Sequence, residues 1–389
     1  MERMLPKEEV MGLFDYIVQP GDTVYSISRL FDITTAALLA ANPQITDIGN
    51  LAVGQTLRIP GMQAARPMIE VNGYAYPNVS ESVLEDILPY LTYLSIIGFE
   101  TNPDGSIIYA DDGALVGAAL LFHVAPLMVV SNRDTLGNYL GELAHMLLSS
   151  DALQQVLIGN IIAHLQETNY YGVNVDFSEI YAEDYAPYAG FLQLLTSQLH
   201  PLGYIVVVAP RINIMLEQAE LLERINRQYF FNGLMDRLIL RTTVWTCTYD
   251  ESLGLSRIDE LQRAVDSAAR MVSSNKILLT VPNCCYDWRI TNAEAVLDRS
   301  LSPAQADELL MASRAKVHID PKTQASYFLY YAQDGTLHQV WCENETNLRG
   351  PLALVSTYRL GGISFRTIDR FSMVSYRTLG SLYEVRKVV

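Results

Sequence analysis

The chain has 389 residues, of which 50% are hydrophobic, so it can bury a large core in two or three domains and does not resemble a disordered protein. Its formal net charge of −16 repels phosphate groups, which makes nucleic acids and anionic membranes unlikely partners. The longest apolar stretch, residues 113–130, is interrupted by His123 and Pro126, and residues 1–10 lack the apolar core of a secretory signal. We therefore expect a soluble protein that is made without a signal peptide.

Residues 15–60 form the first predicted unit. The expected order is strand, helix, helix, strand, over residues 16–18, 24–31, 36–41 and 54–60. Three motifs stand in it in a fixed order: YxVxxGDT at 16–23, AANPQI at 40–45 and LxVGQxLxIP at 51–60. With these motifs the unit resembles a LysM domain over its whole length.

The LysM resemblance implies binding of chitin-like or peptidoglycan chains of N-acetylglucosamine in a shallow groove between two loops. Carried onto this sequence, the groove would be formed by Gly21, Asp22, Thr23, Val24, Asn42, Pro43, Gln44 and Ile45. The alternative at single positions is that Gly21, Asp22 and Asn42 only shape turns.

After a short linker at residues 61–66, the pattern changes and continues to residue 389. Apolar strand-like runs alternate with helical segments, and they lie at residues 69–75, 93–99, 126–130, 172–177, 204–209, 237–243, 276–281 and 361–365. Eight such runs predict an α/β fold, a TIM (β/α)8 barrel over residues 67–389. A helix over 302–313 and a hairpin of 327–331 with 337–342 predict an inserted α+β lobe at about residues 290–350.

The run YYGVNVDFSE at residues 170–179 resembles the fourth-strand signature DxxDxDxE of family 18 glycoside hydrolases. The barrel as a whole is similar to the spore cortex-lytic, peptidoglycan-active branch of that family. There the final glutamate protonates the glycosidic oxygen, and the preceding aspartate orients the substrate's acetamido group. Here Asn174, Asp176 and Ser178 share the inward face, and Ser178 holds the position of the acid. A serine hydroxyl cannot supply that proton near neutral pH.

Other positions that the resemblance assigns to the sugar cleft differ as well. On the sixth strand the family has a motif like MTYE or MTYD, but this chain has Arg241-Thr242-Thr243-Val244, so the tyrosine and the carboxylate are both absent. Cys284 replaces a cleft aromatic, and Phe365-Arg366 replaces the aromatic floor on the eighth strand. The cleft would then be lined by Asp176, Ser178, Thr243, Trp245, Cys284, Tyr286, Trp288 and Arg366. We expect a degenerate site with no catalytic residue intact, in which Asp176 holds strand ends together and Arg241 or Arg366 pairs with acidic groups or with a carboxylated ligand.

The cysteines and histidines do not indicate a metal site. The four cysteines, Cys247, Cys284, Cys285 and Cys342, lack the spacing of a zinc site, and we expect them to be reduced and mostly buried. The alternative is redox cross-linking, with Cys284 and Cys285 as the candidate pair. The six histidines are scattered, and none lies four residues from another. Neither a metal nor a cofactor is expected.

Three hypotheses for function follow. The first is a non-catalytic glycan-binding protein of the bacterial spore envelope, in which the LysM domain binds peptidoglycan or chitin-type oligomers of N-acetylglucosamine. The second is an active N-acetylglucosaminidase acting on cortex peptidoglycan with a relocated acid, such as Glu179, Glu343 or Glu345. The third is a structural protein of the spore coat, with coat proteins as partners. The resemblance implies synthesis in the mother-cell cytoplasm and deposition on the spore.

Overall fold

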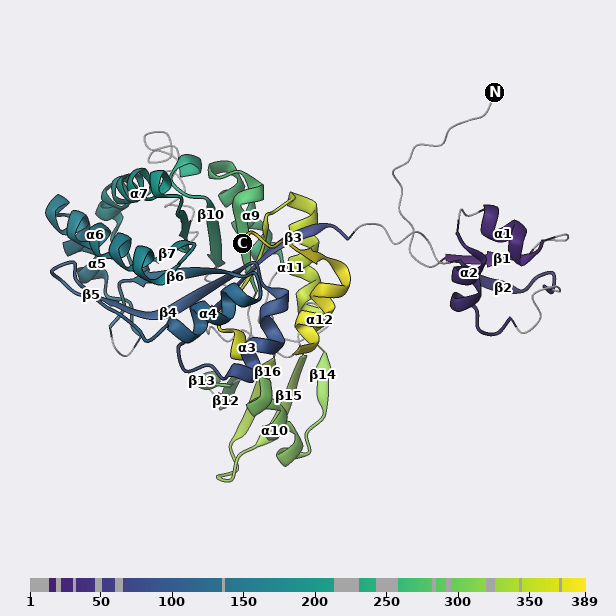
Figure 1. Cartoon of the computed structure of the whole chain (residues 1–389). Coiled ribbons are helices and arrows are strands. Elements are labelled where there is room, and N and C mark those ends of the chain that lie inside the picture. Colours follow the sequence, from purple (N-terminus) through teal and green to yellow (C-terminus); the bar gives the residue numbers. More distant parts are fainter. Residues whose placement is uncertain are drawn as a thin grey trace. The chain divides into compact units, whose positions relative to one another are not determined.

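The chain divides into two compact units, Met1–Pro67 and Met68–Val389, shown in the computed structural model of Figure 1. The structure describes residues 14–18, 22–30, 33–45, 51–59, 66–134, 137–212, 231–242, 258–281, 285–291, 295–301, 303–319, 326–342, 345–370 and 373–389.

The first unit has the expected βααβ order. Its elements are β1 (Phe14–Ile17), α1 (Val24–Leu30), α2 (Thr35–Ala41) and β2 (Thr56–Ile59), and the two strands pair antiparallel. The hydroxyl of Thr34 caps α2 by accepting a hydrogen bond from the backbone N–H of Ala37 at 3.1 Å. The unit has a small core of its own, made by Val18, Val24, Ile27, Leu38, Leu57 and Ile59.

The second unit is a closed barrel of eight parallel strands, as expected. In spatial order they are β3 (Met68–Ala75), β4 (Tyr93–Thr101), β6 (Ala125–Ser131), β7 (Gly172–Asp176), β8 (Ile205–Val208), β10 (Arg237–Thr242), β11 (Ile277–Val281) and β17 (Gly362–Phe365). Pairing of β3 with both β4 and β17 closes the ring. Each of the eight apolar runs in the sequence forms one of these strands, because both faces of a parallel barrel strand are buried.

Helices surround the strands. They are α3 (Glu81–Ile87), α4 (Gly113–Leu121), α5 (Gly141–Leu148), α6 (Asp151–Thr168), α7 (Tyr185–Leu199), α9 (Ile258–Met271), α11 (Glu345–Tyr358) and α12 (Met373–Leu382). Three short strands, β5 (Ile107–Ile108), β9 (Arg211–Ile212) and β18 (Glu384–Val385), add to β4, β10 and β3. No single helix in the described ranges is long and apolar enough to cross a membrane; α5 and α6 meet that test only as a pair bent by 102°.

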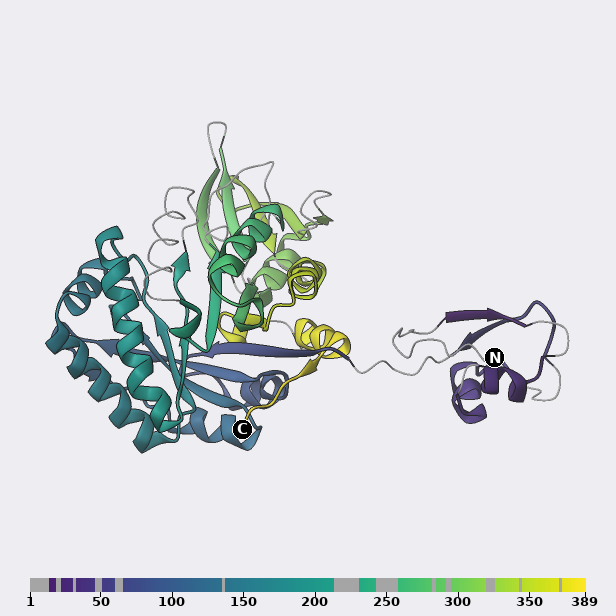
Figure 2. The ribbon, with the colours of Figure 1, turned by 90° about the horizontal axis from the view of Figure 1, so that it is seen from above.

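A lobe projects from one side of the barrel, drawn in green in Figures 1 and 2. It is an antiparallel sheet of β12 (Cys285–Ile290), β13 (Ala295–Leu301), β14 (Val317–Ile319), β15 (Ser326–Tyr331) and β16 (Leu337–Cys342), with α10 (Pro303–Ser313). The expected helix and hairpin are both present. The lobe's bounds differ from the expected range of about 290–350. Its sheet already begins at Cys285, and α11, which starts inside that range, contacts α9 and α12 of the barrel.

One expectation about the cysteines is wrong. Cys285 and Cys342 form a disulfide, so they are not reduced, and the partner of Cys285 is not Cys284. The cause is strand register, because the pairing of β12 with β16 places the two residues directly opposite each other. The other two cysteines, Cys247 and Cys284, lie outside the described residues.

Candidate functional site

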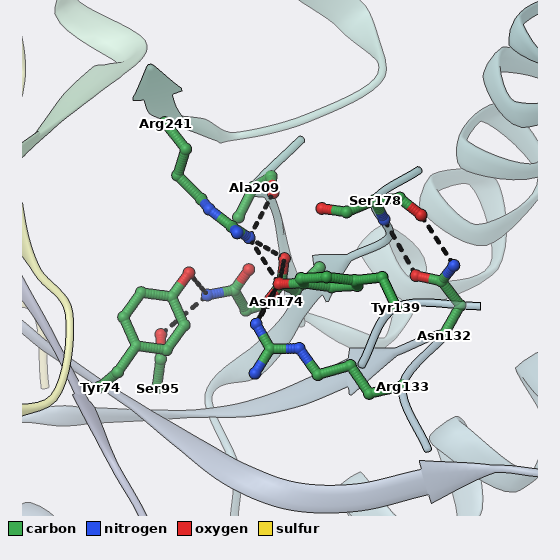
Figure 3. A network of polar contacts seen from close by, with 10 residues as sticks. Tyr74, Ser95, Asn132, Arg133, Tyr139, Asn174, Ser178, Ala209 and Arg241 are labelled. Carbon is green, nitrogen blue, oxygen red and sulfur yellow. Dashed lines mark hydrogen bonds and ion pairs between the residues drawn. The ribbon is translucent and has the colours of Figure 1, made fainter. Parts of the chain in front are cut away.

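Asp176 ends β7 at the carboxyl edge of the barrel, where active sites of this fold are built. It is buried, and both of its oxygens are bonded to protein groups. The hydroxyl of Tyr139 lies 2.9 Å from Oδ1 and 2.8 Å from Oδ2. Arg241 Nη1 donates to Oδ1, and Arg133 Nη2 lies 3.3 Å from Oδ2. Figure 3 shows the side chains of Arg133 and Arg241 turned toward Tyr139.

The two arginines also contact Tyr139. Both guanidiniums donate to its hydroxyl, and that of Arg133 lies over the ring, 4.1 Å from the centroid. Burial opposes the charge of Arg241, but Asp176 and Tyr139 more than offset this effect, so the pKa of Arg241 is raised. The pKa of Arg133 is raised for the same reasons, although Arg241 lowers it. Two charged guanidiniums therefore share one carboxylate.

Asn174 lies two residues earlier on β7 and belongs to a separate polar row inside the barrel. Its Nδ2 donates to the hydroxyls of Tyr74 and Ser95, each at 2.9 Å. Ser95 donates to Asn72 Oδ1 at 2.7 Å, and Asn72 Nδ2 donates to Ser364 at 2.9 Å. Burial raises the pKa of the Tyr74 hydroxyl, which therefore stays protonated. This row joins strands β7, β3, β4 and β17.

Ser178 holds the position at which the family signature has its acid. The residue is buried, and its backbone is bound by Asn132, whose Oδ1 accepts from Ser178 N at 2.9 Å and whose Nδ2 donates to Ser178 O at 2.8 Å. Its hydroxyl has no hydrogen-bond partner in the described part of the chain. Figure 3 shows this hydroxyl pointing away from Asn132. The position thus carries a buried hydroxyl that cannot act as a strong acid.

Glu179 follows Ser178 and has an exposed side chain. Its backbone φ of 56° is unusual for a residue other than glycine and marks a turn after β7. Burial raises the pKa of Tyr185 at the start of α7, and the charge of Glu179 raises it further. The Glu179 carboxylate therefore lies within electrostatic reach of the first turn of α7.

The remaining expected cleft residues fall into two groups. Tyr286 and Trp288 lie on β12 in the lobe, where they are buried in one cluster with Trp341. Arg366 directly follows β17 and is exposed. Thr243, Trp245 and Cys284 lie outside the described residues, as do Glu343 and Val244, so their predicted roles stay predictions.

The predicted LysM groove contains residues with structural roles. Asn42 is fully buried: its Nδ2 donates to the carbonyls of Leu38 and Arg58, and its Oδ1 accepts from the N–H of Arg58. Val24 is in the core, Asp22 accepts from the Tyr16 hydroxyl at 2.7 Å, and the Thr23 hydroxyl accepts from the backbone of Ser26. Pro43 and Gln44 are exposed, Ile45 is half-buried, and Gly21 lies outside the described residues. Glycan binding by these residues remains a prediction.

One acidic cluster lies in the lobe. Ligand atoms of Asp287, Asp298 and His338 lie within 4.8 Å of one another. The buried Asp287 already accepts from Tyr330 at 2.7 Å, contacts His338 Nδ1 at 2.9 Å and pairs with Arg299 at 3.1 Å. Because Arg299 already supplies a positive charge, this group is better suited to hold the sheet together than to bind a cation.

Sequence reasoning missed Arg133 and Tyr139. Both follow β6, and an isolated antiparallel bridge between them places their side chains side by side at the barrel mouth. A signal was available, because polar residues just after each barrel strand reach the same edge.

Comparisons with known proteins agree with this architecture. The LysM domain family matches residues 16–60. The cortical fragment-lytic enzyme of Bacillus subtilis (strain 168) is 26% identical over 407 residues, which is 90% of this chain and 93% of that protein.

Solved structures show the same fold. The Bacillus megaterium QM B1551 spore cortex-lytic enzyme SleL is similar with a TM-score of 0.79 at 21% identity, over 96% of this chain and 87% of that one. A chitinase from Chromobacterium violaceum ATCC 12472 is similar with a TM-score of 0.67 at 22% identity, over 80% of this chain and 98% of that one. The chain therefore consists of a LysM domain followed by a TIM barrel whose fold is like that of the spore cortex-lytic enzyme and the chitinase.

Proposed function

We propose that this protein binds glycans that contain N-acetylglucosamine, such as peptidoglycan or chitin oligomers, without cleaving them. The LysM domain and the glycosidase-type barrel support glycan recognition. The observation that carries the non-catalytic part is the state of the two signature positions on β7. Ser178 is a buried hydroxyl at the acid's position, and Asp176 is engaged by two guanidiniums.

Both roles that the family signature assigns to this strand would be affected, proton donation and orientation of the acetamido group. Without a general acid, no group protonates the leaving oxygen, and this loss typically lowers the rate by about 10² to 10⁴. The aspartate must also hold the substrate's acetamido group, but here each Asp176 oxygen is bonded to Tyr139 and to an arginine. A bound sugar would have to displace these partners before Asp176 could act on it.

We place this function in the spore envelope. The support is the similarity to proteins named a cortical fragment-lytic enzyme and a spore cortex-lytic enzyme. Coat proteins are the partners it would meet there. A fluorescent fusion is expected to collect at the developing spore, and an even distribution through vegetative cells would contradict this location.

The test uses the full-length protein and an N-acetylglucosamine tetramer in isothermal titration, followed by chromatography of the same mixture. We expect binding heat and no shorter products. Shorter products that disappear in an Asp176→Ala variant would overturn the proposal, because they would show that Asp176 still takes part in turnover.

The second candidate function is an N-acetylglucosaminidase with Glu179 as a relocated acid. It is favoured by the exposed carboxylate, by the turn at Glu179 and by the lytic activity in the names of the similar proteins. It predicts that wild type releases fragments from cortex peptidoglycan and that Glu179→Gln does not. Release by both proteins would exclude Glu179 as the acid, and release by neither would favour the first proposal.

A further inference from the structure

The polar cluster around Asp176 carries more positive than negative charge. Arg133 and Arg241 have side chains only 10% and 8% exposed, and they face the single carboxylate of Asp176. Among the described residues, Asp176 is the one carboxylate named among the groups that raise the pKa of these arginines, and Arg241 lowers the pKa of Arg133. A buried cation without its own counter-ion is costly, so the cluster is suited to one further anion.

The arginines also have donors to spare. The described side-chain hydrogen bonds of Arg241 all use Nη1, and those of Arg133 all use Nη2. Each guanidinium offers five N–H donors, so most of them are not used within the described chain. Within the part of the chain that the structure describes, Arg133 Nε is buried without a hydrogen-bond partner, and so is the hydroxyl of Ser178 just after the neighbouring strand β7.

We propose that the barrel mouth binds the carboxylate of an acidic amino sugar, such as the lactyl carboxylate of muramic acid, through Arg133 and Arg241. This inference rests on the proposed glycan-binding function and names the chemical class of its ligand. Guanidinium groups bind carboxylates through short, charged hydrogen bonds, and a nearly dry site strengthens them. Asp176 then acts as an internal competitor that occupies the arginines when no ligand is bound.

The role of Asp176 as a competitor gives a prediction with a definite sign. Replacing Asp176 with asparagine keeps the shape but removes the competing charge, so an acidic sugar should bind more tightly. If the site instead needs Asp176 to hold an acetamido group, Asp176→Asn should bind the sugar more weakly. Replacing Arg241 with glutamine should remove the preference for the acidic sugar.

The experiment is isothermal titration of full-length protein at low salt with two ligands, the disaccharide of N-acetylglucosamine and N-acetylmuramic acid and its lactyl methyl ester. We expect wild type to bind the acid about tenfold to a hundredfold more tightly than the ester, the range for a charged hydrogen bond. The acid-to-ester ratio should rise in Asp176→Asn and fall towards one in Arg241→Gln. Arg377→Gln, an exposed site on α12, is the matched control and should keep the wild-type ratio.

The LysM domain is identical in all these proteins, so a change in the ratio reports on the barrel. Circular dichroism checks that each variant is folded. If a variant is unfolded, the comparison of the acid with the ester on wild type still tests the inference. Equal binding of acid and ester by wild type would overturn this inference and leave the proposed function intact. Binding of neither disaccharide, together with no binding of the N-acetylglucosamine tetramer, would overturn both. A lower ratio in Asp176→Asn would also overturn the inference.

Discussion

The side chains of Arg241 and Asp176 come from β10 and β7, and both are nearly buried where they meet. Removing Asp176 leaves two nearly buried guanidiniums without their carboxylate, and an uncompensated buried charge costs about 3–5 kcal/mol. We therefore expect Asp176→Asn to lower the free energy of unfolding of the barrel by this amount in urea denaturation. The double variant with Arg241→Met should recover part of the loss. A change in Asp176→Asn no larger than that of the surface variant Arg377→Gln would show that the pair contributes little.

Single residues differ in how readily the sequence predicts their roles. Ser178 and Asp176 were identified because the signature on β7 is a linear pattern. Arg241 was expected to pair with an acidic group or a carboxylated ligand, but the sequence could not name the partner, Asp176, because it lies 65 positions away in the chain. Arg133 and Tyr139 depend on the loop after β6, whose geometry is set by tertiary contacts and not by any periodicity.

Strands were predictable from the sequence where both of their faces are buried. Barrel strands such as β11 are buried at every residue, so they form apolar runs that stand out in the sequence. The lobe strands are different: β14 is exposed throughout, and β13 carries an aspartate and an arginine. The disulfide was missed for a related reason, because Cys285 and Cys342 are 57 residues apart and meet only through the register of β12 and β16.

The C-terminal element gives a prediction about pH. β18 pairs with β3, and Lys387 just after it donates to the carbonyls of Leu88 at 3.1 Å and Leu91 at 2.7 Å. Burial lowers the pKa of Lys387 from 10.5 to about 8. The unfolded chain therefore binds more protons than the folded one between these two values, so this group makes the fold more stable as the pH rises through that window.

The measurement compares the free energy of unfolding of wild type with that of Lys387→Met at pH 7.5 and at pH 10. The difference should move in favour of wild type at the higher pH. Burial raises the pKa of tyrosines such as Tyr74, so they lower the free energy of unfolding above about pH 10. This effect is the same in both proteins and cancels in the difference. A difference that does not change with pH would show that the amine is not desolvated in the folded protein.

The molecule as a whole contains two units whose cores share no residue. Among the described residues, the core of the LysM domain comes from Met1–Pro67, and the cores of the barrel and lobe come from Met68–Val389. Chain regions with separate cores are expected to unfold as separate cooperative units. A small domain also buries a lower fraction of its surface than a large one, so the LysM domain should have the smaller stability of the two.

Asn42 provides a test of this independence, because its side chain bonds α2 to β2 inside the LysM domain and lies far in sequence from the barrel. Asn42→Ala leaves the buried carbonyl of Leu38 and the partly buried N–H and carbonyl of Arg58 without this partner, at up to about 1–3 kcal/mol for each group that stays unsatisfied. Scanning calorimetry of the full-length protein should show two transitions. The smaller one should shift to lower temperature in Asn42→Ala, and the barrel transition should stay in place. A single transition that shifts as a whole would mean that the two units unfold together. The LysM domain and the barrel would then have to be treated as one binding unit.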